Sequence, residues 1–333
     1  MTDQESVIYR HADQDGHFRR KASTFRSSIS RSPDAEFPAA KDRYVLYLAW
    51  GCPWAHRTNI VRTLKGLESI IQLVVLDPEL GPDGWFFSGR WDTDTHDPIY
   101  GFKLIQQLYH KASPDYTGRF TIPVLWDKQK ETIVNNESSE IIRMFYTEFD
   151  DLLPEECREV NQPGGGLYPA HLRGEIDAMN EWVYDKINNG VYKTGFATSQ
   201  EAYDANVYAL FEALDRVEAH LEKGGDDRPY LFGEQITEAD VRLYTTVCRF
   251  DVAYYLIFRC NLKMIRHDYP RIDRWYRRLY YDESERTRGG AFKKTTFFYL
   301  YKYNYLKALG KRMGGDQTVV PAGPSPDILP LKL

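Results

Sequence analysis

The stretch from Tyr44 to Gly66 constrains the fold more than any other part of the sequence. It opens with an apolar, β-favouring run, Tyr44–Trp50, which Gly51 ends; Cys52 and Pro53 follow. Apolar residues then recur at helical spacing, at Trp54, Ile60, Val61 and Leu64. Proline is favoured at the first position of a helix, because its missing N–H would be unpaired there anyway. We therefore predict a strand, a turn and a helix whose N-cap is Cys52.

Cys52 at this position is a candidate nucleophile. The start of a helix presents unpaired N–H groups and the positive end of the helix dipole, and both favour the thiolate, which is the reactive form. His56 and Arg57 in the next turn add positive charge. The alternative is a buried structural cysteine, the commoner role of an intracellular Cys. Strand, cysteine, proline and helix in this order are typical of a thioredoxin-like redox site, so we favour the functional interpretation.

The whole chain has 333 residues, which is enough for about two domains. Its net charge of −5 does not indicate a basic surface for binding nucleic acid or an anionic membrane. No apolar run approaches the roughly 18–20 residues of a membrane span, and residues 1–16 lack the apolar stretch of a secretory signal. The four cysteines stand far apart, without C-x-x-C or zinc spacing. Free thiols fit a reducing, cytoplasmic setting best.

Two further segments extend the strand–helix pattern. A second apolar strand over 70–76 would lie parallel to the first, as a right-handed crossover requires. Residues 77–100 are predicted to form a loop insertion, longer than ordinary connections and therefore functional. Apolar residues in 101–112 recur at helical spacing.

A hairpin is expected next, from strands at 124–126 and 132–134. Pro123 lies directly before the first of these strands. A proline is disfavoured inside a central strand, because it cannot donate a backbone hydrogen bond there. A thioredoxin-like fold holds a cis-proline at this place, so we expect the bond between Ile122 and Pro123 to be cis.

Residues 136–149 are predicted to form a helix whose start is a ready carboxylate-binding site, because Ser138 and free N–H groups lie there. The alternative is a plain helix cap, in which Ser138 or Asn136 caps its own helix.

The domain organisation follows from these patterns. Residues 1–43 are polar and are expected to be an extended arm anchored by Phe18, Phe25 and Phe37. Residues 44–150 form the α/β domain, the Pro- and Gly-rich stretch up to 166 resembles a linker, and 165–310 are helical. Thr237 and Asp240 have capping-box spacing within that helical part. Residues 311–333 are a C-terminal tail.

Together these motifs resemble the cytosolic glutathione transferases, which join a thioredoxin-like N-terminal domain to an all-α C-terminal domain. The detailed motifs are similar to the Xi class, the glutathionyl-hydroquinone reductases. The matching segments are Cys52–Arg57, Gly84–Trp85, Ile122–Asp127, Asn136–Phe145 and Asn189–Ala197. The resemblance covers about residues 5–290.

The resemblance implies a role for each matching position. Cys52 is the catalytic thiol. Trp85, Arg119, Ile122, Glu137 and Ser138 bind glutathione, with the backbone of Ile122 pairing with its cysteinyl part and Glu137 and Ser138 holding its γ-glutamyl group. Tyr184 and Tyr305 are candidates for the hydroquinone pocket; the C-terminal stretch keeps the family's tyrosines but not its histidines.

The implied reaction removes glutathione from a glutathionyl-hydroquinone through a Cys52 mixed disulfide. Glutathione is then the co-substrate, with no metal or prosthetic group, and the family suggests a homodimer. A cysteine can attack sulfur, whereas the Ser or Tyr of conjugating transferases can only support a thiolate. The alternatives are an omega-like thiol transferase or dehydroascorbate reductase, and a non-catalytic ligand-binding homologue on the same fold.

Overall fold

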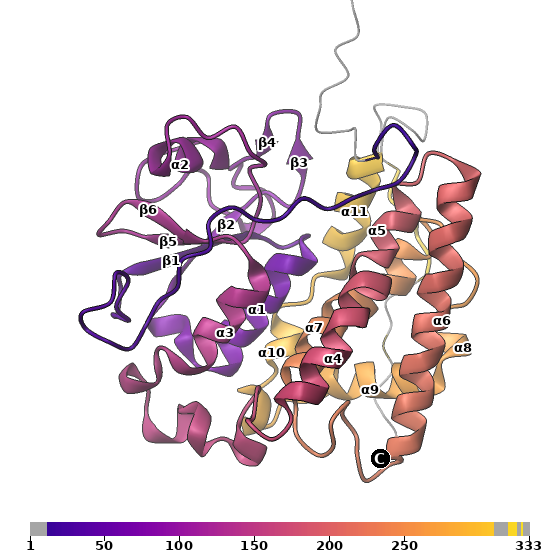
Figure 1. Ribbon diagram of the computed structural model, residues 1–333. Coiled ribbons are helices and arrows are strands. Elements are labelled where there is room, and N and C mark those ends of the chain that lie inside the picture. Colours follow the sequence, from indigo (N-terminus) through magenta and orange to yellow (C-terminus); the bar gives the residue numbers. More distant parts are fainter. Residues whose placement is uncertain (1–11, 310–318, 325–327, 329–333) are drawn as a thin grey trace, which may run out of the picture. The chain divides into compact units, whose positions relative to one another are not determined.

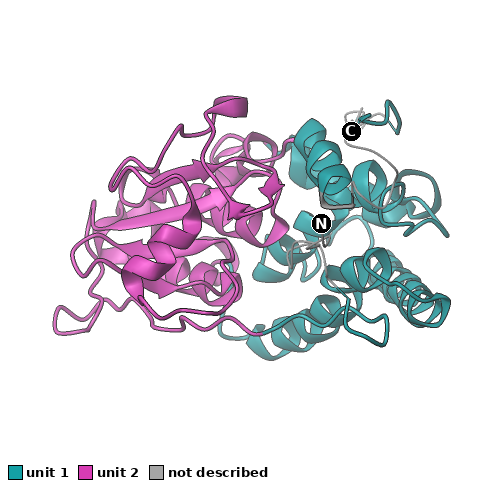
Figure 2. Ribbon diagram, turned by 90° about the horizontal axis from the view of Figure 1, so that it is seen from above, with its two compact units in different colours: residues 1–21, 167–282, 298–333 teal, residues 22–166, 283–297 magenta. Residues whose placement is uncertain are grey.

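The computed structural model describes residues 12–309, 319–324 and 328. These residues form two compact units (Figure 2). The first comprises 22–166 and 283–297, and the second comprises 12–21, 167–282 and 298 onward. The remaining parts of the expected arm and tail lie outside the described residues. We describe each unit by itself.

The first unit is organised around strand β1 (Tyr44–Ala49), helix α1 (Pro53–Leu64) and strand β2 (Gln72–Leu76). β1 and β2 are parallel, with Val45 opposite Gln72, so the predicted β-α-β unit is confirmed. Every residue of β1 is at most 1 % exposed, which explains its uninterrupted apolar sequence. α1 ends just before Gly66, whose φ of 67° is the left-handed conformation that commonly follows a helix.

The sheet is completed by an antiparallel hairpin, β5 (Val124–Asp127) and β6 (Thr132–Asn135), in the order β2-β1-β5-β6. Helices α1 and α3 (Ser138–Thr147) lie on one face, and α2 (Ile105–Ala112) lies on the other (Figure 1). This mixed sheet with helices on both faces is the predicted thioredoxin-like arrangement. The expected loop over 77–100 is partly structured, because it contains the short paired strands β3 (Leu80–Gly81) and β4 (Gly84–Trp85).

Short helices fill the rest of the first unit. They are η2 (Leu67–Ser69), η3 (Arg90–Asp92), η4 (Asp150–Leu152), η5 (Glu155–Cys157), η6 (Glu159–Asn161), η7 (Pro163–Gly165), η10 (Glu285–Thr287) and α10 (Ala291–Lys294). A buried charge cluster joins the end of α1 to this region: Lys65 Nζ lies 3.3 Å from Asp150 Oδ1 and 3.0 Å from Glu159 Oε2. Such a cluster persists because each charge has a partner.

The N-terminal arm contributes to both units. Its residues 12–21 pack within the helical unit, where the ring of Phe18 lies 5.4 Å from that of Phe196. The part from 22 onward packs within the sheet unit, where Phe37 is 3 % exposed and the ring of Phe25 lies 5.8 Å from that of Tyr109. All three predicted phenylalanine anchors are therefore in contact with folded parts of the protein.

The second unit is helical, as predicted. Its elements are α4 (Arg173–Val183), the π-helical turn η8 (Tyr184–Asn188), α5 (Gly190–Gly195), α6 (Gln200–Gly224), α7 (Glu238–Arg249), the π-helical turn η9 (Phe250–Tyr254), α8 (Ile265–Asp268), α9 (Pro270–Tyr281) and α11 (Phe298–Leu309). None of the helices in the described residues combines the length and the apolar character needed to cross a bilayer.

The capping box predicted at the start of α7 is confirmed. Asp240 Oδ2 accepts a hydrogen bond of 2.8 Å from the backbone N–H of Thr237. Its other oxygen accepts from the indole Nε1 of Trp275 at 2.8 Å and from the N–H of Leu231 at 3.0 Å. One buried carboxylate thus ties the start of α7 to α9 and to the preceding loop.

Candidate active site

Cys52 occupies the turn between β1 and α1, at the predicted N-cap. Its backbone is extended (φ −77°, ψ 120°), Pro53 is the first helical residue, and the Cys52 carbonyl accepts the first helical bond from His56 N at 2.9 Å. The side chain makes no cap hydrogen bond, and it is 8 % exposed. The thiol therefore sits at the positive end of α1, where the thiolate is favoured.

The loop before β5 approaches the same thiol. The bond between Ile122 and Pro123 is cis, as predicted. The Sγ atom of Cys52 lies 3.8 Å from the carbonyl oxygen of Ile122. The structure thus brings together the candidate nucleophile and the residue whose backbone is expected to pair with the cysteinyl part of glutathione.

Residues around the start of α1 come from a distant part of the chain. His56 Nε2 lies 2.9 Å from Thr295 Oγ1, and the rings of Trp50 and Phe297 are 4.7 Å apart. The guanidinium of the buried Arg57 lies over the ring of Trp54, 4.8 Å from its centre. Thr295 and Phe297 could not be identified from the sequence, because contacts across more than 200 residues leave no local signal.

Glu137 and Ser138 are at the start of α3. Glu137 is the N-cap, and its Oε1 accepts hydrogen bonds from the backbone N–H of Ser139 at 3.2 Å and from the Ser139 hydroxyl at 3.0 Å. Ser138 is the first helical residue and is 3 % exposed. Glu137 therefore caps the helix in place of Ser138 or Asn136, and carboxylate binding at this helix start stays a prediction.

Asn136 has other partners. Its Oδ1 accepts from the N–H of Phe25 at 3.1 Å, and its Nδ2 donates to the hydroxyl of Tyr109 at 3.0 Å. The amide thereby links the arm, α2 and the start of α3, and it shapes the loop that carries Glu137.

Trp85 and Arg119 lie on two other segments of the first unit. Trp85 is half-buried in β4, opposite Leu80. Arg119 is exposed, three residues before Ile122, and its carbonyl oxygen accepts a hydrogen bond of 3.0 Å from the hydroxyl of Tyr116. The assignment of Trp85 and Arg119 to glutathione remains a prediction from the motifs.

The two candidate pocket tyrosines occupy different environments in the helical unit. Tyr184 is half-buried in the first position of η8. Tyr305 is 3 % exposed, and its hydroxyl lies 2.8 Å from that of Tyr192 and 2.7 Å from that of Tyr254. Burial raises the pKa of Tyr305 and that of Tyr254, so these two phenols stay protonated. The partners Tyr192 and Tyr254 were not identified from the sequence, where they are two tyrosines among 24.

A thioredoxin-like unit and an all-helical unit together are the architecture of the glutathione transferases, and in this chain a cysteine lies at the helix start beside a cis-proline. Two family models agree. The one described as "Glutathione S-transferase, N-terminal domain" matches residues 51–148, and the one described as "Glutathione S-transferase, C-terminal domain" matches residues 200–278.

Individual proteins are similar over most of the chain. A glutathionyl-hydroquinone reductase of Escherichia coli is 47 % identical over 80 % of this chain and 79 % of its own. The glutathione S-transferase omega-like 2 of Schizosaccharomyces pombe is 45 % identical over 95 % of this chain and 96 % of its own. The crystal structure of the Xi glutathione transferase of Phanerochaete chrysosporium is 48 % identical, with a TM-score of 0.85 and 96 % of both chains covered. The chain therefore belongs to the glutathione transferase family, and within that family to the Xi class.

Glutathione is a bound ligand in one of these relatives. The Xi glutathione transferase of Saccharomyces cerevisiae, solved in complex with glutathione, has a TM-score of 0.85 and 40 % identity over 95 % of this chain and 99 % of its own.

Proposed function

We propose that this protein is a glutathione-dependent reductase that removes glutathione from glutathionyl-hydroquinones. The observation that carries the proposal is the placement of Cys52 at the start of α1, with its Sγ 3.8 Å from the carbonyl oxygen of Ile122. A cysteine there can form a disulfide with glutathione, which a serine or tyrosine cannot. The similarity to a protein named glutathionyl-hydroquinone reductase supports the substrate class.

The reaction has two steps, and in each of them a thiolate attacks a glutathione or disulfide sulfur. The Cys52 thiolate attacks the glutathione sulfur, a sulfur–sulfur bond forms, the bond from sulfur to the aromatic carbon breaks, and that carbon takes a proton. A second glutathione thiolate then attacks the mixed disulfide and releases glutathione disulfide and the Cys52 thiolate. The balance is one glutathionyl-hydroquinone and one glutathione giving one hydroquinone and one glutathione disulfide. The aromatic carbon is reduced, and the two glutathione sulfurs are oxidised.

The residues of the first unit suit the charges of glutathione. Glu137 is proposed to take the ammonium of the γ-glutamyl group, while the Ser138 hydroxyl and the first N–H groups of α3 take its carboxylate. The backbone of Ile122 pairs with the cysteinyl part, Arg119 takes the glycyl carboxylate, and Trp85 packs against the tripeptide. Tyr184 and Tyr305 remain the proposed contributors to the hydroquinone pocket.

A reducing compartment and a symmetric assembly complete the proposal. All four cysteines are free of disulfide bonds in the structure, and a cytoplasmic location is proposed. The homodimer suggested by the Xi class is proposed for this chain as well.

A second candidate function is a broader omega-like thiol transferase or dehydroascorbate reductase. This candidate is supported by the similarity to the Schizosaccharomyces pombe protein, which is named as omega-like. It uses the same Cys52 chemistry with another substrate. Relative kcat/KM for a glutathionyl-hydroquinone, a glutathionylated peptide and dehydroascorbate ranks the two candidates.

The test is quinol release with glutathione disulfide formation, measured for the wild type, Cys52→Ser and Cys157→Ser. Cys157 is a matched control in the same unit, where serine keeps an acceptor for the Arg288 guanidinium that contacts the Cys157 sulfur. We expect Cys52→Ser to lose at least about a thousandfold of turnover and Cys157→Ser to retain it. A Cys52→Ser variant with wild-type turnover would show that Cys52 is not the nucleophile.

A further inference from the structure

The N-terminal arm forms an additional edge next to β6 and the loop that leads into α3. The N–H of Ser27 donates to the carbonyl of Val134 at 3.0 Å, and the N–H of Asn136 donates to the carbonyl of Phe25 at 3.1 Å. Arg26 and Asn135 are paired as an antiparallel bridge between these two hydrogen bonds. Five arm residues, 23–27, therefore lie against the segment that carries the proposed γ-glutamyl site.

Ser23 is the arm residue that contacts Glu137, the proposed glutathione-binding residue, directly. Its hydroxyl lies 3.1 Å from Glu137 Oε2 and 3.2 Å from the carbonyl oxygen of Asn136. A hydroxyl has one hydrogen to donate, and the charged carboxylate is the stronger acceptor. The other carboxylate oxygen of Glu137 is already held by the N–H and hydroxyl of Ser139. With Ser23 in place, each of the two carboxylate oxygens of Glu137 has a hydrogen-bond donor.

We infer that Ser23 is a positioning residue for glutathione, which fixes the Glu137 carboxylate in the orientation that receives the γ-glutamyl ammonium. This inference rests on the proposed glutathione site and adds an arm residue to it. A free glutamate side chain samples many rotamers, and fixing it before the ligand arrives removes that ordering cost from binding. The arm is thus part of the binding site rather than only a cover for a sheet edge.

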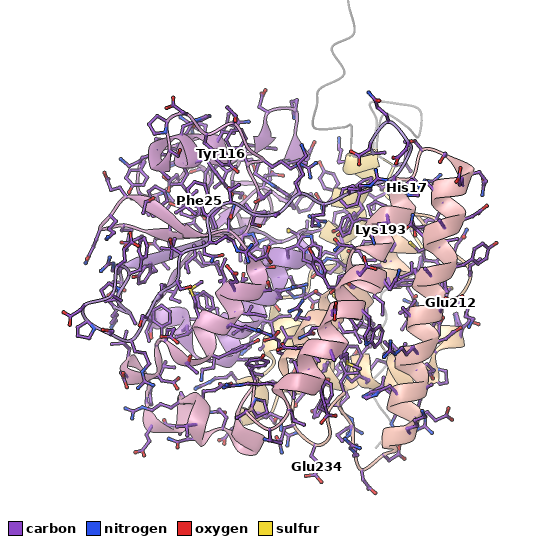
Figure 3. All side chains as sticks on the ribbon, viewed as in Figure 1. His17, Phe25, Tyr116, Lys193, Glu212 and Glu234 are labelled. Carbon is purple, nitrogen blue, oxygen red and sulfur yellow. The ribbon has the colours of Figure 1, made fainter. Side chains whose placement is uncertain are left out.

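The arm is held in place by contacts that do not involve Ser23. The rings of Phe25 and Tyr116, which lie next to each other in Figure 3, have centres 5.5 Å apart. Arg26 Nε donates to Glu140 Oε2 at 2.7 Å, and Asn135 Nδ2 donates to the carbonyl of Ser27 at 3.0 Å. Removing one hydroxyl at Ser23 should therefore leave the arm docked, so the effect on Glu137 can be measured by itself.

The experiment is calorimetric binding of S-methylglutathione, which cannot form a disulfide with Cys52, and of the same compound lacking its amino group. Ser23→Ala should weaken binding of S-methylglutathione about tenfold, the worth of one hydrogen bond to a charged group, and leave binding of the deamino analogue unchanged. Ser23→Thr keeps the hydroxyl and should restore most of the affinity. Ser23→Asp places a second carboxylate beside Glu137. The ratio of the affinities for the two ligands should therefore differ from the wild-type ratio by more than it does in Ser23→Ala.

Two variants serve as controls. Ser28→Ala changes an exposed arm serine whose side chain makes no hydrogen bond among the residues described, and it should bind both ligands as the wild type does. Glu137→Ala should abolish discrimination between the two ligands.

Three outcomes would overturn the inference. Equal loss for both ligands in Ser23→Ala would assign the hydroxyl a structural role, and no loss for either would show that Glu137 is positioned without it. If Glu137→Ala itself binds both ligands normally, the glutathione site is assigned wrongly. Quinol release by the wild type is measured separately, so a failure of the proposed reaction is distinguishable from a failure here.

Discussion

Two regions of the protein each place a cysteine at the end of a helix: one cysteine lies at the start of α1 and the other near the end of α7. Cys52 immediately precedes α1 and is 8 % exposed, whereas Cys248 lies in the last turn of α7 and is 2 % exposed. Cys52 therefore meets the positive end of a helix dipole and Cys248 the negative end. Burial raises the pKa of the Cys248 thiol to about 11, although the neighbouring Arg249 acts in the opposite direction. The same side chain is suited to attack at one place and to packing at the other.

The surroundings of the two thiols differ in kind as well. Near Cys52 the chain presents a backbone carbonyl, that of Ile122, at 3.8 Å. Cys248 donates to the carbonyl of Thr245 at 3.5 Å within its own helix, in a region filled by large aromatic side chains such as Tyr244 and Tyr301. Cys260 resembles Cys248, because it is 0 % exposed and burial raises its pKa. We therefore propose that the helix end and solvent access set the reactivity of each thiol.

The largest expected effect is on alkylation. In the folded protein at pH 7, iodoacetamide should modify Cys52 at least about a thousandfold faster than Cys248, because a thiol with a pKa near 11 is almost wholly protonated four pH units lower. Peptide mapping of a time course in a Cys157→Ser background measures the two rates. Comparable rates at Cys52 and Cys248 would break the comparison.

The second effect is on stability at alkaline pH. Burial raises the folded-state pKa of Cys248 from an ordinary 9.0 to about 11. The protonated thiol therefore contributes fully to the unfolding free energy below about pH 9, and this contribution is lost as the pH rises towards 11. The difference in unfolding free energy between wild type and Cys248→Ala should therefore shift by up to about 3 kcal/mol across that window. Urea unfolding at several pH values tests this, and a constant difference from pH 8 to 11 would mean that the thiol is not buried.

The smallest effect compares substitutions at the two helix ends at neutral pH. Cys52→Ser should change the unfolding free energy by less than about 0.5 kcal/mol, because serine is a preferred N-cap. Cys248→Ala should cost about 1–2 kcal/mol, because it leaves a small cavity in a packed core. Urea unfolding at pH 7 gives both values. The reverse order would show that the sulfur of Cys52 has a structural role.

The parts of the fold set by local signals were predictable from the sequence. Pro53 after an apolar run located the start of α1, and Thr237 with Asp240 located the start of α7. Pro123 before a short apolar strand located the cis bond beside Cys52. In each case a few neighbouring residues carry the physical requirement, such as a missing N–H or a cap.

Contacts between distant segments were not predictable. The hydrogen bond from Ser23 to Glu137 depends on the register of the arm against β6, and that register comes from long-range pairing rather than from the arm's own sequence. The same holds for Thr295 beside His56, and for Asp150 and Glu159 around Lys65, which lie in or next to a stretch whose composition indicates a linker. Local composition cannot show which charges will be buried together.

The central claim is that Cys52 carries the covalent chemistry. The most direct test is the intact mass of the folded protein after incubation with glutathione disulfide, followed by peptide mapping. The account predicts a gain of one glutathionyl group on Cys52, its removal by added glutathione, and no gain in Cys52→Ser. No adduct on the wild type, or an adduct that persists in Cys52→Ser, would contradict it.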